Sequence, residues 1–211
     1  MLMDLLQMST RIAEFCASAR VGLGGHSHTG IYSAWILSLD GHDGWSQQSS
    51  VTGSVGNLCL NDGNLFLMRK AGVMRLADAL GRHQSQLESA VLRAAHWFAQ
   101  ATLQEQRGHE TLCLVIALEA IFSASRHVIA EGAARLVGVA PPEQRSIFDI
   151  VQKAYSIRNE AVHEGNAAQE FQYQGQLYLI VQRLISKCAL MCDELETTDE
   201  LIRRVDGMRF A

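Results

Sequence analysis

The chain has 211 residues, of which 48% are hydrophobic and 19% charged, so it can bury a sizeable core as one domain, with or without a small appendage. Its formal net charge is −4, and Lys plus Arg never outnumber Asp plus Glu: the counts are 4 against 5 in residues 1–70, 6 against 6 in 71–136 and 8 against 11 in 137–211. This balance excludes an extended surface for nonspecific duplex binding, which needs many cationic phosphate contacts, but it leaves room for a small arginine cluster.

We expect a cytoplasmic protein with no membrane span. No apolar run approaches the length that crosses a bilayer, and residues 1–19 carry three charges where a signal peptide would be continuously apolar. Cys188 and Cys192 lie one helical turn apart, but no second pair has matching spacing, so we expect no metal and no cofactor. The cysteines are odd in number and set among apolar residues, which indicates reduced core side chains; they are Cys16, Cys59, Cys113, Cys188 and Cys192.

Residues 1–70 predict a helix followed by a small β-element. Apolar residues at helical spacing favour a helix over 3–19, which the glycines at 22–25 end. Short apolar runs separated by Gly, Asn, Asp and Ser then predict strands. These strands are expected at 31–39, 57–60 and 65–68, with a hairpin turn at 61–64 and an exposed loop at 44–56.

Residues 71–211 predict a helical bundle that forms the second unit of the chain. Short links between long helices favour antiparallel neighbours, so the expected fold class is mainly α, an antiparallel helical bundle with a small N-terminal β-element. The helices are expected at 73–80, 84–105, 110–137, 141–165 and 169–195, with a short charged helix at 197–209.

Glu119 is the exception in residues 112–122, which are otherwise apolar almost all round the expected helix. A carboxylate buried there needs a cation or several hydrogen bonds, because otherwise it would be protonated. Arg158, at the edge of the apolar face of the helix over 141–165, is the most suitable partner in the chain.

Arg158, Asn159 and His163 form the leading candidate site, near the end of that helix. Pro141 and Pro142 suit its first turn and Gly165 its C-terminal cap. At roughly 100° per residue, positions 158 and 163 lie about 140° apart around the axis, so one helix makes a poor site. Two copies meeting across a two-fold axis would bring two arginines and two histidines into one groove, and symmetric dimers are the commonest oligomers.

Three segments together resemble the HEPN superfamily, and the Apea-like HEPN group most closely. They are Leu118-Glu119 in an apolar helix, the sequence AARL at 133–136 and the sequence YSIRNEAVHEG at 155–165. The likeness covers about residues 85–195, and its sharpest part is Arg158-Asn159 followed by His163. The resemblance implies an all-α bundle that forms a homodimer and, in active members of the family, a metal-independent endoribonuclease.

Carried onto this chain, the resemblance implies a role for each site residue. His163 would act as general base on a ribose 2′-hydroxyl or as acid on the leaving oxygen, Arg158 would hold the scissile phosphate, and Asn159 would orient either group. Glu160 and Glu164 lie near His163 and favour its imidazolium form. The supporting residues are Glu119, Tyr155 and Glu160.

Two other functions stay open at this stage. Arg158 could serve only as the counter-ion of Glu119 while His163 caps its helix, which would make the chain a dimerisation or protein-partner module. Alternatively, the chain could bind RNA or a nucleotide without cutting it, because a fold does not determine a function. The sequence does not name an RNA, or choose between a toxin, defence or regulatory role.

Overall fold

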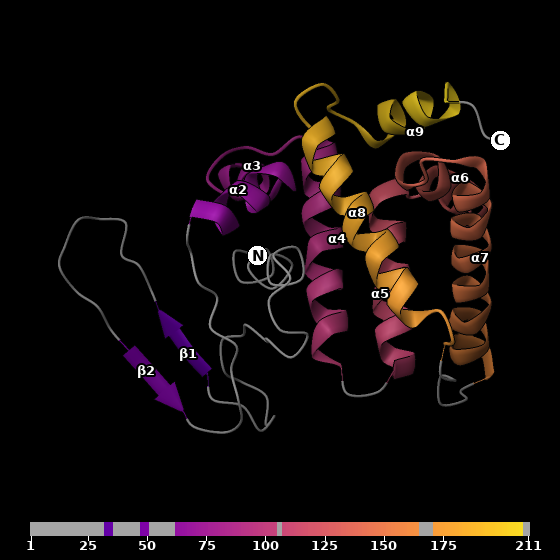
Figure 1. The fold of residues 1–211 in the computed structure, drawn as a ribbon, viewed down its shortest axis with the longest axis horizontal. Helices are drawn as coiled ribbons and strands as arrows, with labels where there is room; N and C mark the ends of the chain where they lie inside the picture. The colour runs from indigo at the N-terminus through magenta and orange to yellow at the C-terminus, as the bar shows by residue number, and fades with distance from the viewer. Residues whose placement is uncertain (1–31, 36–46, 51–61, 105–106, 165–170, 209–211) are drawn as a thin grey trace.

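The computed structural model describes residues 32–35, 47–50, 62–104, 107–164 and 171–208, and this part of the chain is mainly helical (Figure 1). It contains the strands β1 (Tyr32–Trp35) and β2 (Gln47–Ser50). The helices are α2 (Asp62–Lys70), α3 (Val73–Ala79), α4 (Gln86–Leu103), α5 (Arg107–Phe122), α6 (Arg126–Val137), α7 (Pro141–Glu164), α8 (Gln174–Met191) and α9 (Thr198–Asp206).

The predicted helical bundle is confirmed. The long helices α4, α5, α7 and α8 form its body, and α8 packs against α4, α5, α6 and α7 (Figure 1). The short helix α9 contacts α4, α5 and α6 across one end of the bundle. Large apolar side chains from several helices fill the core and are fully buried, among them Phe98, Leu114, Leu118, Phe122 and Leu177. Burying such side chains is the main favourable term in forming the bundle.

The two strands pair antiparallel, with Tyr32 opposite Ser50 and Trp35 opposite Gln47. β1 lies inside the strand predicted over 31–39. β2 lies inside the predicted loop over 44–56, so that prediction is wrong for residues 47–50. Its polar sequence QQSS carries no strand signal, and pairing with β1 determines its conformation. The predicted helix over 3–19, the glycines at 22–25 and the strand over 57–60 lie outside the described residues.

The strand predicted over 65–68 and the hairpin turn at 61–64 are wrong, because residues 62–70 form α2. An apolar run of four residues does not distinguish a strand from a helix by its periodicity. In α2, Leu65 and Met68 are three residues apart and both contact the core, while Arg69 and Lys70 lie in the last turn, where cations suit the helix dipole. The boundary between two units at residue 70 stays a prediction.

The single helix predicted over 110–137 is also wrong. The chain breaks at residues 123–125, and the axes on either side, α5 and α6, differ by 85°. Ser123 takes a left-handed conformation with φ of 49°, and its N–H donates to the Glu119 carbonyl at 2.8 Å to end α5. Within the described residues, no single helix is long and apolar enough to cross a membrane, and only this bent pair reaches that length together.

Gly132 lets α6 fold back closely onto the end of α5. A Cβ atom at this position would lie 2.6 Å from Cε1 of Phe122 and 2.7 Å from its Cζ, and the Phe122 ring is buried. The sharp turn at residues 123–125 therefore depends on a glycine in the facing helix.

We predict that Gly132→Ala destabilises the protein, although alanine is the better helix former. Overpacking costs about 1–3 kcal/mol, against a gain in helix propensity of about 1 kcal/mol. The free energy of unfolding from urea titration measures the net loss. Gly175→Ala is the matched control, because a Cβ there meets nothing within 4 Å in the first turn of α8. Equal or greater stability of the Gly132 variant would contradict the close packing.

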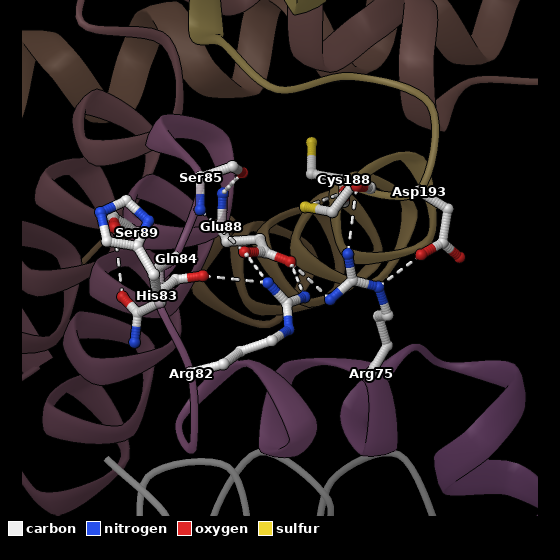
Figure 2. A network of polar contacts seen from close by, with 10 residues as sticks. Arg75, Arg82, His83, Gln84, Ser85, Glu88, Ser89, Cys188 and Asp193 are labelled. Atoms are coloured by element: carbon white, nitrogen blue, oxygen red, sulfur yellow. Dashed lines mark hydrogen bonds and ion pairs between the residues drawn. The ribbon is translucent and has the colours of Figure 1, made fainter.

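The buried carboxylate of Glu88 joins α3 to α4, and Figure 2 shows its contacts. Ser85 and Glu88 form a capping box at the start of α4: the Glu88 N–H donates to the Ser85 hydroxyl at 3.1 Å, and the Ser85 N–H donates to Glu88 Oε2 at 2.8 Å. Glu88 is only 1% exposed. Arg82 donates to both of its carboxylate oxygens, and Arg75 Nη1 lies 2.6 Å from Oε1. Two guanidinium groups thus balance one buried carboxylate.

Arg75 extends this cluster to the end of α8. Its Nε donates to Asp193 Oδ1 at 2.5 Å and its Nη2 donates to the Cys192 carbonyl at 3.1 Å. Burial opposes ionisation of Glu88, but hydrogen bonds from Arg82, the Ser85 amide and Arg75 outweigh it and lower the pKa of this carboxyl to about 2. The Glu88 carboxylate is therefore fully partnered by groups of this cluster, which holds α3 against α4 and α8.

Candidate functional site

The candidate site lies on α7, which begins at Pro141 and ends at Glu164 as the sequence predicts. At its first turn, Glu143 accepts a hydrogen bond from the Val139 N–H at 2.9 Å, which places a carboxylate at the positive end of the helix dipole. The inner face of α7 packs against α5, α6 and α8 through buried residues that include Ile147, Val151 and Ala154. This packing fixes the helix on which Arg158 lies.

Arg158 pairs with Glu119 of α5, as the sequence suggested. Arg158 Nη2 lies 3.6 Å from Glu119 Oε1, and its Nη1 donates to Asn159 Oδ1 at 3.2 Å. The two charged side chains are 32% and 34% exposed, so Glu119 lies at the rim of the bundle and not in its core. The ion pair is long and partly hydrated, and pairs of this kind contribute about 0–1 kcal/mol.

Tyr155 adds a buried phenol to this cluster. Its side chain is on the inner face of α7, the residue is 4% exposed, and its hydroxyl lies beside the Glu119 carboxylate. Burial raises the pKa of Tyr155 well above its usual value, and the nearby Glu119 carboxylate raises it further, against the opposing charge of Arg158. The phenol is therefore a permanent hydrogen-bond donor at neutral pH.

Arg158 also has a buried donor without a partner. Within the described part of the chain, no acceptor reaches its Nε. Buried polar atoms in proteins are nearly always hydrogen-bonded, and exceptions often mark a site whose partner is a water, an ion or a ligand. This donor beside one loose ion pair makes the cluster of Glu119, Tyr155, Arg158 and Asn159 suited to an incoming acceptor, such as a phosphate oxygen.

The structure places the backbone of His163 on the same helix as Arg158. The helical backbone continues to residue 164, so positions 158 and 163 lie on one helix, about 140° apart around its axis. The side chains of residues 161–164 are outside those described. Glu160 is exposed on the same helix. The two-copy arrangement that would join Arg158 and His163 stays a prediction.

A hollow of about 630 Å³ lies along the outer side of α7, and sequence analysis did not identify it. Lys153 Nζ lies over the ring of Tyr173, 4.7 Å from its centroid. The sequence does contain a signal, because Arg145, Asp149 and Lys153 recur at spacings of four and therefore share a helix face. The hollow is lined by Pro141, Pro142, Arg145, Ser146, Asp149, Ile150, Lys153 and Tyr173.

The described side chains contain no group of three or more His, Cys, Asp or Glu residues arranged to hold a metal ion. Cys188 and Cys192, which the sequence offered as half of a zinc site, are both buried free thiols. The Cys192 thiol donates to the Cys188 carbonyl at 3.2 Å, which is an ordinary contact between successive turns of a helix.

No known protein family, no characterised protein and no solved structure matches this chain. The fold and the site define a mainly helical bundle with an arginine-centred polar cluster at its rim.

Proposed function

We propose that the chain is a HEPN-like domain, with its small N-terminal β-element, and acts as a metal-independent endoribonuclease in a homodimer. The observation that carries this proposal is the state of Arg158: a guanidinium one-third exposed at the rim of the bundle, with one loose carboxylate partner at 3.6 Å and an unpartnered Nε. An arginine in this state can turn to a phosphodiester without leaving a buried charge behind.

The chemistry needs few groups, because RNA supplies its own nucleophile. His163 takes the proton of the ribose 2′-hydroxyl or gives one to the leaving 5′-oxygen, and Arg158 stabilises the charge that develops on the phosphate. Asn159 uses its Oδ1 to accept from Arg158, which leaves its amide NH₂ free to donate to the substrate. No step requires a metal ion or a cofactor.

Glu119 and Tyr155 act as supporting groups for Arg158. Glu119 keeps the guanidinium at the rim while the site is empty, through an ion pair of little net strength. When a phosphate takes Arg158, the Glu119 carboxylate loses one partner, and the Tyr155 hydroxyl beside it remains as a donor. The two supporting groups thus lower the cost of releasing Arg158 to the substrate.

The proposal requires two copies of the chain. Arg158 and His163 lie too far apart around one helix axis to act on one phosphate from the same face, so the groups from two α7 helices must face each other. With a two-fold axis between the two α7 helices, Arg158 of one copy faces His163 of the other, so each phosphate site has both residues.

The test is cleavage of a mixed RNA pool in EDTA by the purified full chain, run beside His163→Ala at matched dimer content. We expect the wild type to leave 2′,3′-cyclic phosphate ends and the variant to lose about 10²–10⁴ in rate. His109→Ala is the matched control, because this exposed histidine of α5 has no part in the proposed site. Equal cleavage by wild type and His163→Ala would exclude the mechanism.

The second candidate is a noncatalytic module for RNA or nucleotide binding, or for dimerisation or a protein partner. The same ion pair favours it, since Arg158–Glu119 joins α7 to α5 and contributes to their register whatever else it does. In that case a folded, dimeric wild-type protein would leave the RNA pool intact.

A further inference from the structure

The hollow on the outer side of α7 has the chemistry of an anion-binding surface. Arg145 and Lys153 both line the hollow, and both are exposed. The ring of Tyr173 holds the Lys153 ammonium at one edge of it, 4.7 Å from the ring centroid. Ser146 adds a hydroxyl donor, and Asp149 is the one acid in the lining.

The spacing of the two cations indicates an extended ligand. Arg145 and Lys153 are eight residues apart on one helix, which is about 12 Å along its axis, so the two side chains suit two separate anionic groups better than one. Arg158 follows Lys153 after five more residues, about 7.5 Å further along the same helix and about 140° around its axis, so the hollow and the proposed cleavage site lie on different sides of α7. A single strand that meets both must therefore pass around the helix.

We propose that this hollow binds the sugar-phosphate backbone of single-stranded RNA in a stretch that flanks the bond that is cut, an inference that rests on the proposed function. Arg145 and Lys153 contact two phosphates, and Ser146 donates to an oxygen of one of them. A short single strand fits better than a duplex, because two cations on an acidic chain form a small patch and not an extended surface.

Removing the charge of Asp149 should change RNA affinity in the opposite direction to removing a cation. Its carboxylate lies between the two cations along the helix and lines the same hollow, so it repels a phosphate there. Arg145→Gln and Lys153→Gln should each weaken binding severalfold, whereas Asp149→Asn should strengthen it. If the hollow does not contact RNA, these substitutions should not change the affinity in opposite directions.

The experiment measures fluorescence anisotropy of a labelled RNA of about 12 nucleotides that carries 2′-O-methyl groups, and so cannot be cut through its 2′-oxygen. Affinity is measured for the full chain over a range of salt concentrations. We expect Arg145→Gln and Lys153→Gln each to lower the slope of log affinity against log salt by about 0.7, the value for one phosphate contact on a single strand. Arg93→Gln and Lys187→Gln are the charge-matched controls, on exposed positions of α4 and α8.

The outcomes separate this inference from the proposed function. If the hollow variants bind RNA like their controls while His163→Ala still abolishes cleavage, the hollow is not part of the RNA path and the nuclease stands. If the protein never cuts RNA but the hollow variants show the expected slopes, the binding site stands and the catalytic proposal falls. Competition by polyglutamate as strong as by unlabelled RNA, with equal losses in the variants, would overturn the inference in favour of an acidic peptide.

Discussion

Glu88→Gln should lower the free energy of unfolding by about 3 kcal/mol at pH 7, the largest effect on stability that we expect from one substitution. Glutamine keeps the shape of the side chain and can still accept from the Ser85 N–H, so the substitution removes the charge and little else. Arg75 and Arg82, whose side chains are 20% and 48% exposed, then lose their bonds to this buried carboxylate, although Arg75 keeps Asp193 as a partner. Each hydrogen bond to a charged group contributes about 1.5–3 kcal/mol.

The pH dependence of the unfolding free energy is a second test of the Glu88 cluster. The pKa of Glu88 is about 2 in the folded chain, against an ordinary value of 4.5. Because the folded-state pKa is lowered, the stabilisation is complete above pH 4.5 and is lost as the pH falls from 4.5 towards 2. The difference in unfolding free energy between wild type and Glu88→Gln should therefore shrink from about 3 kcal/mol to near zero over that window.

Glu200→Gln is the matched control for both measurements. Glu200 forms the equivalent capping box with Thr197 at the start of α9, but on the surface. The pKa of Glu200 is also lowered, through hydrogen bonds from the Glu196 and Thr197 N–H groups, so its variant measures what a capping box contributes without two arginines on a buried carboxylate. A loss in Glu88→Gln no larger than in Glu200→Gln would show that Arg75 and Arg82 add nothing.

The parts of the fold that the sequence predicts are those with local causes. The helix α7 has prolines at its start, a regular apolar face and a glycine just after its end, and each of these signals acts within a few residues. The short charged helix predicted over 197–209 is found as α9 for the same reason, because a Thr-x-x-Glu capping box fixes where it begins.

The errors arise where contacts distant in sequence decide the conformation. Residues 123–125 are Ser-Ala-Ser, and Ser125 is the N-cap residue of α6, so a local signal was present but weak, and the close turn also depends on Gly132 packing against Phe122. Residues 65–68 are apolar enough for a strand, but packing on the core makes them helical. The Glu88 cluster also depends on contacts distant in sequence, because Asp193 is more than a hundred residues from Arg75.

In the candidate site, too, local features could be predicted and features set by helix packing could not. The pairing of Arg158 with Glu119 could be predicted, because a single acid in an apolar helix needs a cation. Its place at the rim could not, since it depends on how α5 and α7 pack. The unpartnered Arg158 Nε has no sequence signal either, because a buried donor usually finds a partner.

Arg158→Ala should abolish RNA cleavage, with a loss of about 10²–10³ in rate, because it removes the group that stabilises the developing phosphate charge. Arg158→Lys should restore little of this rate. A lysine keeps the charge but cannot offer two parallel donors to a phosphate while a third bonds Asn159. Both variants should remain folded, since the ion pair that they alter is one-third exposed and weak. Single-turnover cleavage in EDTA measures the rate, and urea titration checks the fold.

Glu119→Gln separates the catalytic role of Arg158 from the structural one. If Arg158 only balances Glu119, removing either partner breaks the same α5–α7 contact, and the two single variants should change stability and activity alike. If Arg158 holds the phosphate, Glu119→Gln leaves the guanidinium in place and should keep cleavage within about tenfold of wild type, while Arg158→Ala loses it. Equal losses in both variants would assign the pair to the architecture of the bundle, and the double variant would then be no worse than either single one.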